Sequence, residues 1–507
     1  MLLAVKTWIS TITRLMVLFG ISTDVIALKT IVVGSGPGGT GFIKHALELD
    51  PVDTFIWFEE GKEENVLSWP EVYTAPGSED YLKLTDRVTS KLLKAARWSG
   101  FGGGGMLNSG GPLTLAQSTD SRIQQAVEKY GSQVLEEELQ SPELTDPTSD
   151  TWIARYKDAG YEVQAHFQTL HGTAQDFRVG YGATTFYNGT RTQVAEQVRK
   201  NPRVELHLRS PVHHIVFEIN TTKAIGVELM NSTIIYADRV VLAGGVFGTY
   251  KMLINSGIGS AQDLETARVN TIVENELVGK NIGDDSGLLF LHKGFRQESN
   301  EASHGADVVA LKGDQYSLTH WGKITYDALL LGTYIRPRIF SSLLRMIFQS
   351  VSMVKVDLPS KYAMSLSIRD DGSLLLDDSE DTIGETCLAD NEFEVLKQAR
   401  LPPILSRCLS AIMGITYLTS KKQCTSGTRL SIHHFHGGSQ GILDDHFLVK
   451  NTQELYISDA SVTDGYRFGA PTTNVYLIGY AVADAIYGQT QNSLEKKPSQ
   501  NSNDLKV

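Results

Sequence analysis

The chain has 507 residues, a formal net charge of −12 and a hydrophobic fraction of 41%. This size and composition fit one large two-part architecture or two to three domains, and they exclude a disordered chain. The acidic balance, with no sustained basic run, argues against a nucleic-acid partner. The three cysteines, Cys387, Cys408 and Cys424, have no C-x-x-C spacing, so we expect no disulfide framework and no metal site, and a single disulfide is left open.

The first 27 residues form an apolar segment whose role the sequence leaves open. Its uninterrupted apolar stretch, residues 15–21, is shorter than the roughly 18–20 residues that cross a bilayer. No A-x-A-like cleavage site follows this stretch. Residues 1–27 therefore fit a secretion or targeting signal and a plain N-terminal helix of a cytoplasmic protein equally well.

A strand, a glycine-rich turn, a helix and a second strand follow in close succession. Residues 28–33 are apolar and largely β-branched, residues 34–39 are G-S-G-P-G-G, and apolar residues then recur at helical spacing up to residue 49. Residues 54–58 are a second apolar run. This order predicts a βαβ unit of about 30 residues that opens a Rossmann-like domain.

The glycine spacing in this unit is typical of a dinucleotide site. Gly34 permits a tight turn, and Gly36 lets the backbone approach a pyrophosphate. Gly39 lets the helix and strand pack closely, and Gly38 belongs to the same turn. Glu59 follows the second strand, about 20 residues beyond Gly39, where a carboxylate accepts hydrogen bonds from a ribose. Taken alone, the unit does not distinguish NAD from FAD.

A second glycine cluster, G-G-G-G-M-L-N-S-G-G, occupies residues 102–111. Glycines leave a backbone without side chains, which the close approach of an isoalloxazine ring requires, and a flexible loop is the alternative interpretation. Residues 118–170 have helical periodicity and include an acidic run at residues 136–138, typical of a solvated helix face.

Residues 204–242 change to the alternation of β-strands separated by turns. They predict an antiparallel meander that begins at residues 204–208 and ends in a buried strand at residues 239–243. Residues 288–430 have mixed character and are expected to form a variable second domain. Within them, the amphipathic residues 336–354 fit a lid over an apolar pocket, a membrane-surface helix, or a helix packed on the core.

The rear of the chain contributes histidines, an acid and a helix. Residues 431–438 are S-I-H-H-F-H-G-G, residues 458–461 are S-D-A-S, and residues 475–486 have helical periodicity. A neutral imidazole takes the proton of a hydroxyl group or hydrogen-bonds the alkoxide that results. Residues 489–507 are rich in Asn, Gln, Ser and Lys and are expected to be disordered.

With these motifs in this order, the chain resembles the glucose–methanol–choline (GMC) oxidoreductase family over about half of its length. The matching motifs, besides the glycine segments, are A-I-G-V-E-L, V-V-L-A-G-G, L-I-N-S-G-I-G, V-G-K-N-I-G-D and S-D-A-S. The cluster at residues 102–111 looks most like the cholesterol-oxidase branch. The resemblance implies an FAD-dependent oxidoreductase that oxidises the CH–OH group of an alcohol or sterol-like substrate and passes electrons to O2 or another acceptor.

The resemblance also implies which residues hold FAD. The positions that match cofactor contacts of the family, beyond the first glycine turn and Glu59, are Gly103, Gly104, Asn108, Val212, Asp459 and Ala460. Val212 corresponds to the residue beside the adenine, and Asp459 to the acid near the pyrophosphate. Residues 106–107 are Met-Leu where some members carry a histidine that binds the flavin covalently, so we expect noncovalent FAD.

His434 corresponds to the family histidine that stands before flavin N5 and assists hydroxyl deprotonation, although Gly438 replaces the usual threonine of that motif. The family places a second His or Asn further along the chain, where this sequence has Ala470. Asn474 lies one turn beyond and is our candidate for the substitute. Asp285 replaces another usual histidine. We therefore assign His434 and Asn474 as the catalytic pair.

The fold expected from the elements and the resemblance is α/β, with a three-layer, Rossmann-like FAD-binding domain. A second α+β substrate-binding domain is expected on an antiparallel sheet. We assign residues 28–117, 186–287 and 431–488 to the first domain, and residues 118–185 and 288–430 to the second. The alternatives are a flavin-dependent lyase or decarboxylase of the same fold, a flavin-binding protein that has lost catalysis, and an NAD(P) dehydrogenase.

Overall fold

The computed structural model describes the segments that form the main sheets and most of their connections. They are residues 27–61, 82–87, 95–107, 118–138, 147–167, 177–182, 186–187, 190–191, 194–284, 286–292, 306–312, 315–321, 350–356, 364–377, 386–387, 424–425, 430–431, 434–465 and 471–495. The predictions for residues 1–26, Asn108, residues 336–349 and Ala470 lie outside these segments.

A five-stranded parallel sheet lies at the centre of the first domain. In spatial order its strands are Leu455–Ile457 (β27), Arg239–Leu242 (β13), Lys29–Val33 (β1), Thr54–Phe58 (β2) and Val204–His207 (β9). All four pairings are parallel. Strands β1 and β2 are buried along nearly their whole length, as apolar strands covered on both faces are. The sheet confirms the βαβ unit predicted at the start of the chain.

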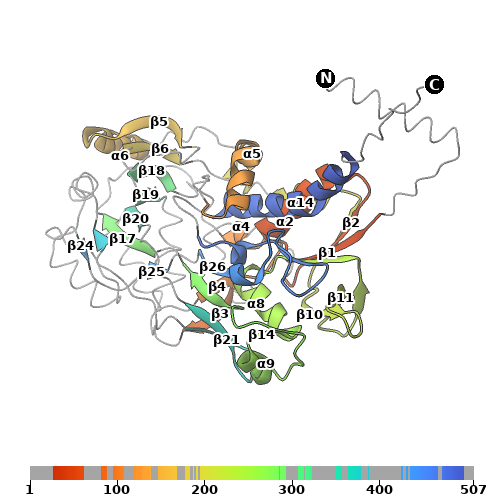
Figure 1. Ribbon diagram of the computed structural model, residues 1–507. Coiled ribbons are helices and arrows are strands. Elements are labelled where there is room, and N and C mark those ends of the chain that lie inside the picture. The colour runs from red at the N-terminus through yellow and green to blue at the C-terminus, as the bar shows by residue number, and fades with distance from the viewer. Residues whose placement is uncertain are drawn as a thin grey trace, which may run out of the picture.

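Two helices from opposite ends of the chain, Pro37–Leu49 (α2) and Thr472–Glu495 (α14), lie side by side over this sheet (Figure 1). Glycines make their contact close. A Cβ on Gly41 would lie 2.2 Å from the Tyr476 carbonyl oxygen, and one on Gly479 would lie 2.3 Å from the amide nitrogen of Phe42. Helix α14 extends the predicted helix at both ends, so the segment up to Glu495 is helical where disorder was expected.

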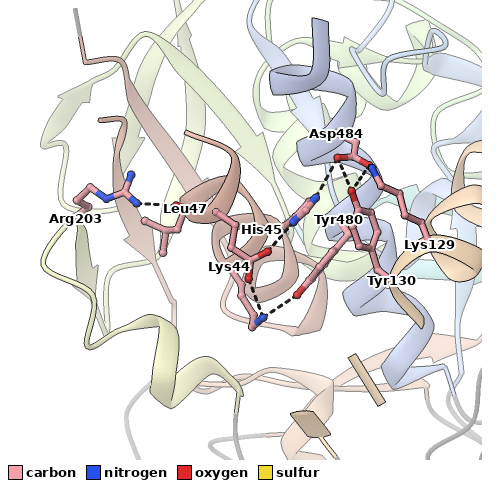
Figure 2. A network of polar contacts seen from close by, with 9 residues as sticks. Lys44, His45, Leu47, Lys129, Tyr130, Arg203, Tyr480 and Asp484 are labelled. Carbon is pink, nitrogen blue, oxygen red and sulfur yellow. Dashed lines mark hydrogen bonds and ion pairs between the residues drawn. The ribbon is translucent and has the colours of Figure 1, made fainter. Parts of the chain in front are cut away.

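A polar cluster connects α2 and α14 to a third helix, Ser121–Glu138 (α5) (Figure 2). The buried His45 of α2 stacks on Tyr480, with ring centroids 4.3 Å apart, and its Nε2 lies 3.0 Å from Asp484. The Tyr130 hydroxyl of α5 donates to Asp484 at 2.9 Å. Burial opposes ionisation of Asp484, but hydrogen bonds from His45 and Tyr130 hold its pKa below the ordinary value. The cluster therefore contains an ionised carboxylate that joins three helices.

The predicted antiparallel meander is present but shorter than expected. Its strands are Val212–Phe217 (β10), Ala224–Leu229 (β11) and Ile234–Tyr236 (β12). The assignment of both ends of this meander is wrong. Strand β9, at residues 204–207, pairs in parallel with β2 at the edge of the main sheet, and β13, at residues 239–242, pairs in parallel with β1 and β27 inside it. An edge strand is buried on one face only, so its sequence alternates as an antiparallel strand does.

A seven-stranded sheet forms a second layered unit, on the opposite side of the molecule from β1 and β2 in Figure 1. In spatial order its strands are Leu430–Ser431 (β25), Ser286–His292 (β17), Ser350–Val356 (β20), Gln315–Trp321 (β19), Ala306–Lys312 (β18), Phe177–Gly182 (β6) and Glu162–Phe167 (β5). The pairings are antiparallel except β5 with β6. The sheet combines strands from both segments assigned to the second domain.

Two helical expectations on this sheet are corrected. The helices Ser121–Glu138 (α5) and Pro147–Asp158 (α6) lie within the stretch predicted to be helical, but β5 follows them at residues 162–167. Residues 350–354, assigned to the amphipathic segment, belong to β20. In both places polar and apolar residues alternate, and pairing with a neighbouring strand selects the extended backbone.

A four-stranded sheet combines strands from segments assigned to both domains. In spatial order it comprises Ser365–Ile368 (β21), Leu374–Asp377 (β22), Leu82–Arg87 (β3) and Ala95–Trp98 (β4). The side chains of Met364, Leu366 and Leu376 are fully buried in the core that also contains β1 and β2. Residues 364–377 therefore pack on the first domain, although they fall inside the segment 288–430 assigned to the second.

Shorter elements complete the described parts of the chain. They are Gly104–Leu107 (α4), Phe186–Tyr187 (β7), Thr190–Arg191 (β8), Val194–Val198 (α7), Gly245–Asn255 (α8), Ile258–Gly259 (β14), Ala261–Ala267 (α9), Val273–Glu274 (β15), Lys280–Gly283 (β16), Thr386–Cys387 (β23), Cys424–Thr425 (β24), His436–Gly438 (β26), and the 3-10 turns Gln440–Ile442 (η2) and Ala460–Val462 (η3). No helix within the described segments is both long and apolar enough to cross a membrane.

The close contact of α2 and α14 leads to a matched pair of substitutions. Gly479→Ala places a methyl group against the α2 backbone, and we expect the free energy of unfolding to fall by about 1–3 kcal/mol. Gly488→Ala in the same helix meets nothing within 4 Å and should be neutral or stabilising by up to about 1 kcal/mol, because alanine favours helix. Urea unfolding measures both variants, and equal effects would contradict the packing explanation.

Candidate functional site

The turn after β1 is formed by glycines in contact with neighbouring backbone. Gly34 has a φ of +110°, and a Cβ there would lie 2.2 Å from the Ala243 carbonyl oxygen. A Cβ on Gly39 would lie 2.3 Å from the Gly34 carbonyl oxygen, so only glycine lets α2 approach the strand this closely. Gly36 is the N-cap of α2 and supplies no capping side chain. The first N–H groups of α2 can therefore bind an anionic group.

The second glycine cluster lies directly on this turn. Gly103 has a φ of +55°, and a Cβ there would lie 2.5 Å from the Cα of Gly36. The Gly102 amide donates to Ser35 Oγ at 3.0 Å. Nothing lies within 4 Å of a Cβ placed on Gly104, so the space beside that residue is open. The first glycine turn and the described part of the second cluster, residues 102–105, are therefore in direct backbone contact.

The rear of the chain completes the same region. Ser458 Oγ donates to the Gly38 carbonyl oxygen at 3.1 Å, and a Cβ on Gly38 would lie 2.0 Å from the Ser458 carbonyl oxygen. A Cβ on Gly105 would lie 3.4 Å from Pro37 Cγ and 3.9 Å from Thr472 Cγ2. The glycine turn, the glycine cluster and the two rear segments therefore meet.

Most of these residues directly follow the carboxyl ends of neighbouring parallel strands. Gly34 follows β1, Glu59 follows β2, Ala243 follows β13 and Ser458 follows β27. Open parallel sheets bind ligands at this edge, because the loops there leave a crevice between the helices. Residues from motifs that are far apart in sequence therefore lie together at the carboxyl edge of the parallel sheet.

Glu59 is buried, and three hydrogen bonds hold its carboxylate. Oε2 accepts from the Ser35 amide at 3.1 Å and from the Ser35 hydroxyl at 2.6 Å, while Oε1 accepts from the Gly61 amide at 2.8 Å. Burial raises the pKa of Glu59, and these hydrogen bonds partly offset the effect. A carboxylate offers about four acceptor positions, so Glu59 retains capacity for a further donor such as a ribose hydroxyl.

Asp459 holds the rear loop against α8. Its Oδ2 accepts from the Gly245 amide at 2.9 Å and from the Thr249 hydroxyl at 2.5 Å. Its Oδ1 accepts from the Ser461 amide at 2.9 Å. Burial raises the pKa of Asp459, while the hydrogen bonds from Ser461, Thr249 and Gly245 lower it. Ala460 follows as the first residue of η3.

His434 and His436 have different surroundings. The His434 amide donates to Asp284 Oδ1 at 2.9 Å, and His434 is only partly buried. His436 is 4% exposed, its Nδ1 lies 3.0 Å from the His434 carbonyl oxygen, and a Cβ on Gly283 would lie 2.2 Å from its Nε2. The His436 ring therefore packs in the core of the loop, and His434 is the more accessible histidine.

The other predicted residues have distinct positions. Val212 is partly exposed at the start of β10. The loop before it is held near Glu59, because the Ser210 amide donates to the Glu59 carbonyl oxygen at 2.9 Å. Asn474 is fully buried in the first turn of α14. Asn108 lies outside the described residues.

Sequence reasoning missed three residues that organise the site. They are Ser35, which bridges Glu59 and Gly102, Thr249, which bonds Asp459, and Asp284, which accepts from the His434 amide. Ser35 lies inside the glycine fingerprint and Asp284 ends the V-G-K-N-I-G-D motif, so both belong to motifs that the sequence analysis identified. Their partners are far away in sequence, and spacing alone does not identify them.

Comparison with known proteins supports this interpretation. Residues 60–286, a little under half of the chain, match the family model described as GMC oxidoreductase. An uncharacterised GMC-type oxidoreductase of Rhodococcus erythropolis is 33% identical over 90 residues, which are 17% of this chain and 18% of that protein. Pyranose dehydrogenase 3 of Leucoagaricus meleagris is 31% identical over 97 residues, which are 18% of this chain and 14% of that protein. The chain thus matches under a fifth of the length of these relatives.

Solved structures extend the likeness to nearly the whole chain. Formate oxidase of Aspergillus oryzae, from a study of a mutation and FAD modification, superposes with a TM-score of 0.63 at 15% identity. The superposition covers 93% of this chain and 100% of that one. At this identity the likeness shows the fold, and it confirms the predicted α/β class with a Rossmann-like domain.

Burial of Glu59 gives folding a pH dependence that can be measured. Because its pKa is raised in the folded chain, the folded state holds the proton more tightly, and stability falls as pH rises through the folded pKa. Glu59→Gln cannot ionise, so we expect the Tm of the wild type to fall relative to this variant as pH rises above the ordinary value of 4.5. Thermal melts between about pH 4 and about pH 8 test this.

The control for that series is Glu265→Gln, which changes an exposed carboxylate on α9. Its Tm difference from the wild type should stay nearly constant over the same pH range. A constant difference for Glu59→Gln as well would show that the buried carboxyl group does not contribute.

Proposed function

We propose that this chain is a GMC oxidoreductase, the family whose model matches residues 60–286, and that it is an FAD-dependent oxidoreductase acting on the CH–OH group of a small-molecule alcohol. The observation that carries the proposal is the meeting of both glycine segments with the rear loop at the carboxyl edge of the parallel sheet. That edge offers glycine backbone without side chains, helix N–H groups without a capping side chain, and a buried carboxylate, which are the groups a dinucleotide needs.

FAD would be held by residues from all of these segments. The N–H groups at the start of α2, after Gly36, would bind the pyrophosphate, with Asp459 fixing the rear loop beside it. Glu59 would accept from the ribose, and Val212 would lie beside the adenine. Gly103, with Gly104 and Asn108, would contact the flavin. We propose noncovalent binding, since the Met-Leu at residues 106–107 offers no histidine.

His434 is the group that we propose takes the substrate's hydroxyl proton. FAD, when bound, supplies the acceptor for the hydride that leaves the carbon. A neutral imidazole is suited to accept the proton of a hydroxyl group. The bond from the His434 amide to Asp284 and the packed ring of His436 fix the backbone on which this imidazole stands. Asn474 is our candidate for the second polar partner.

We propose that the seven-stranded sheet and its connections form the substrate side. Residues 28–117, 186–287 and 431–488 would bind the cofactor, and residues 118–185 and 288–430 would bind the substrate, except residues 364–377, which pack on the first domain. The glycine cluster at 102–111 favours a sterol-like or other apolar alcohol, as in the cholesterol-oxidase branch, while a named relative is a pyranose dehydrogenase. O2 or another acceptor would reoxidise the flavin.

One observation favours a second candidate function. Ala470 stands where the family usually has His or Asn, and Asn474 is fully buried. A site with a single polar partner fits a flavin-dependent lyase or decarboxylase of the same fold. Anaerobic mixing with a panel of alcohols separates the two reactions, because only an alcohol oxidoreductase has its flavin bleached by them.

Cofactor binding is tested by the absorbance spectrum of the purified protein. We expect a flavin spectrum with about one FAD released per chain on denaturation, as a single dinucleotide fold implies. Gly103→Val should lose most of that FAD, because its side chain would overlap the Cα of Gly36. Gly488→Ala on the outer part of α14 is the control and should keep it. A colourless wild-type protein that takes up no added FAD would refute the proposal.

The role of His434 is tested by the rate of flavin reduction. We expect His434→Ala to keep its flavin spectrum and to be reduced more slowly by a factor on the order of 100, since a positioned acid–base group contributes about that much. His446→Ala, an exposed histidine of the same segment, should behave as the wild type. Stopped-flow measurement under anaerobic conditions distinguishes them, and an unchanged rate in His434→Ala would remove this residue from the mechanism.

A further inference from the structure

A β-bulge at the start of the meander places two histidines side by side. The register of β10 on β11 advances from Val212 opposite Leu229 to His214 opposite Glu228, so His213 is the extra residue of the bulge. In a regular strand, neighbouring side chains point to opposite faces. A bulge re-aims one of them, and here the rings of His213 and His214 meet with centroids 5.0 Å apart.

Glu228 completes a cluster with these rings. The Nδ1 atoms of His213 and His214 lie 3.0 Å apart, and His214 Nε2 lies 3.6 Å from Glu228 Oε2. One donor atom from each of the three residues lies within 4.8 Å of the other two. Two ligands of one zinc ion, each about 2.1 Å from it, lie up to about 4.2 Å apart. The three donor atoms are therefore separated by little more than the ligands of one zinc ion, and His213, the most exposed of the three residues, lies at the surface.

We infer that His213, His214 and Glu228 form a binding site for a divalent transition-metal ion of the zinc class. Two imidazoles and one carboxylate are ligands that zinc accepts, with a water in the fourth position. The ion would replace one of the two contacts that His214 now makes, with His213 at Nδ1 or with Glu228 at Nε2. The expectation of no metal site rested on cysteine spacing, which does not detect ligands brought together across strands.

The backbone around the cluster is held in place without a metal. The Asn255 side chain donates to the His213 carbonyl oxygen at 3.1 Å, and the Ile215 amide donates to Ser256 Oγ at 2.9 Å. Both partners lie at the C-terminal end of α8. The bulge is thus fixed between α8 and β11, so the ligand positions exist before an ion binds and little ordering is needed.

The consequence of binding would be local. An ion shared by β10 and β11 joins two strands of the meander at the end where Val212 begins the first of them. A ligand that binds only the folded state raises its stability in proportion to the logarithm of its concentration. Metal binding should therefore stabilise the meander, whatever the reaction of the enzyme.

The test is isothermal titration of the full chain with Zn²⁺ at about pH 7.5, where imidazole is mostly neutral. We expect a site that His213→Ala, His214→Ala or Glu228→Gln each weakens by about tenfold or more, because even indirect support of a metal ligand has effects of that size. The Tm of the wild type should rise with Zn²⁺, and that of His214→Ala should rise less. Melts without metal establish that each variant folds.

The matched control is His207→Ala, which removes a partly exposed histidine of β9 that stacks on Phe58 and lies 2.9 Å from Glu205. Its affinity for Zn²⁺ should equal that of the wild type. Equal affinity in His213→Ala, His214→Ala and the wild type would overturn the inference and assign any binding to other imidazoles. A loss in His207→Ala as large as in the cluster variants would overturn it as well.

Discussion

Backbone atoms from the two ends of the chain touch at glycines, with no side chain between them. A Cβ on Gly38 would lie 2.0 Å from the carbonyl oxygen of Ser458, 420 positions away in sequence, and Gly479 lies against the backbone of α2. Because a single methyl group at either glycine would overlap backbone atoms, the distance between the front turn and the rear segments is fixed by the glycines themselves. The rest of the candidate site is assembled on this contact.

The electrostatic character of the site follows from how its acids are satisfied. Glu59 and Asp459 are buried beyond the carboxyl ends of β2 and β27, two strands of the same parallel sheet, and both accept hydrogen bonds from amide and hydroxyl donors of the surrounding loops. These donors hold both carboxylates in place. Burial raises the pKa of each acid, and the hydrogen bonds partly offset that rise. The N–H groups at the start of α2 point along the helix axis toward an incoming phosphate. The first turn of α2 contains no acidic residue that would repel the phosphate.

The two faces of the meander β10–β12 have different surroundings. Its buried side chains, such as Ile215 and Val227, belong to the core of the first domain. The outward residues of the same strands, His214 and Glu228, are opposite each other in register. The bulge beside them changes the face of the strand toward which the His213 side chain points. His213 therefore joins His214 and Glu228 in a ligand cluster on the surface, at the end of the loop that leads from Glu59.

The sequence by itself determined the βαβ unit, the acid at the end of its second strand and the order of the family motifs. These depend on neighbouring residues, whose spacing imposes the period of a helix or strand and the sharp turn at Gly34. It did not determine that residues 204–207 pair in parallel, that residues 162–167 are a strand, or that Ser35 bridges Glu59 and Gly102. Those features depend on contacts between distant segments, and an alternating pattern has the same period in either kind of sheet, so only the tertiary structure decided them.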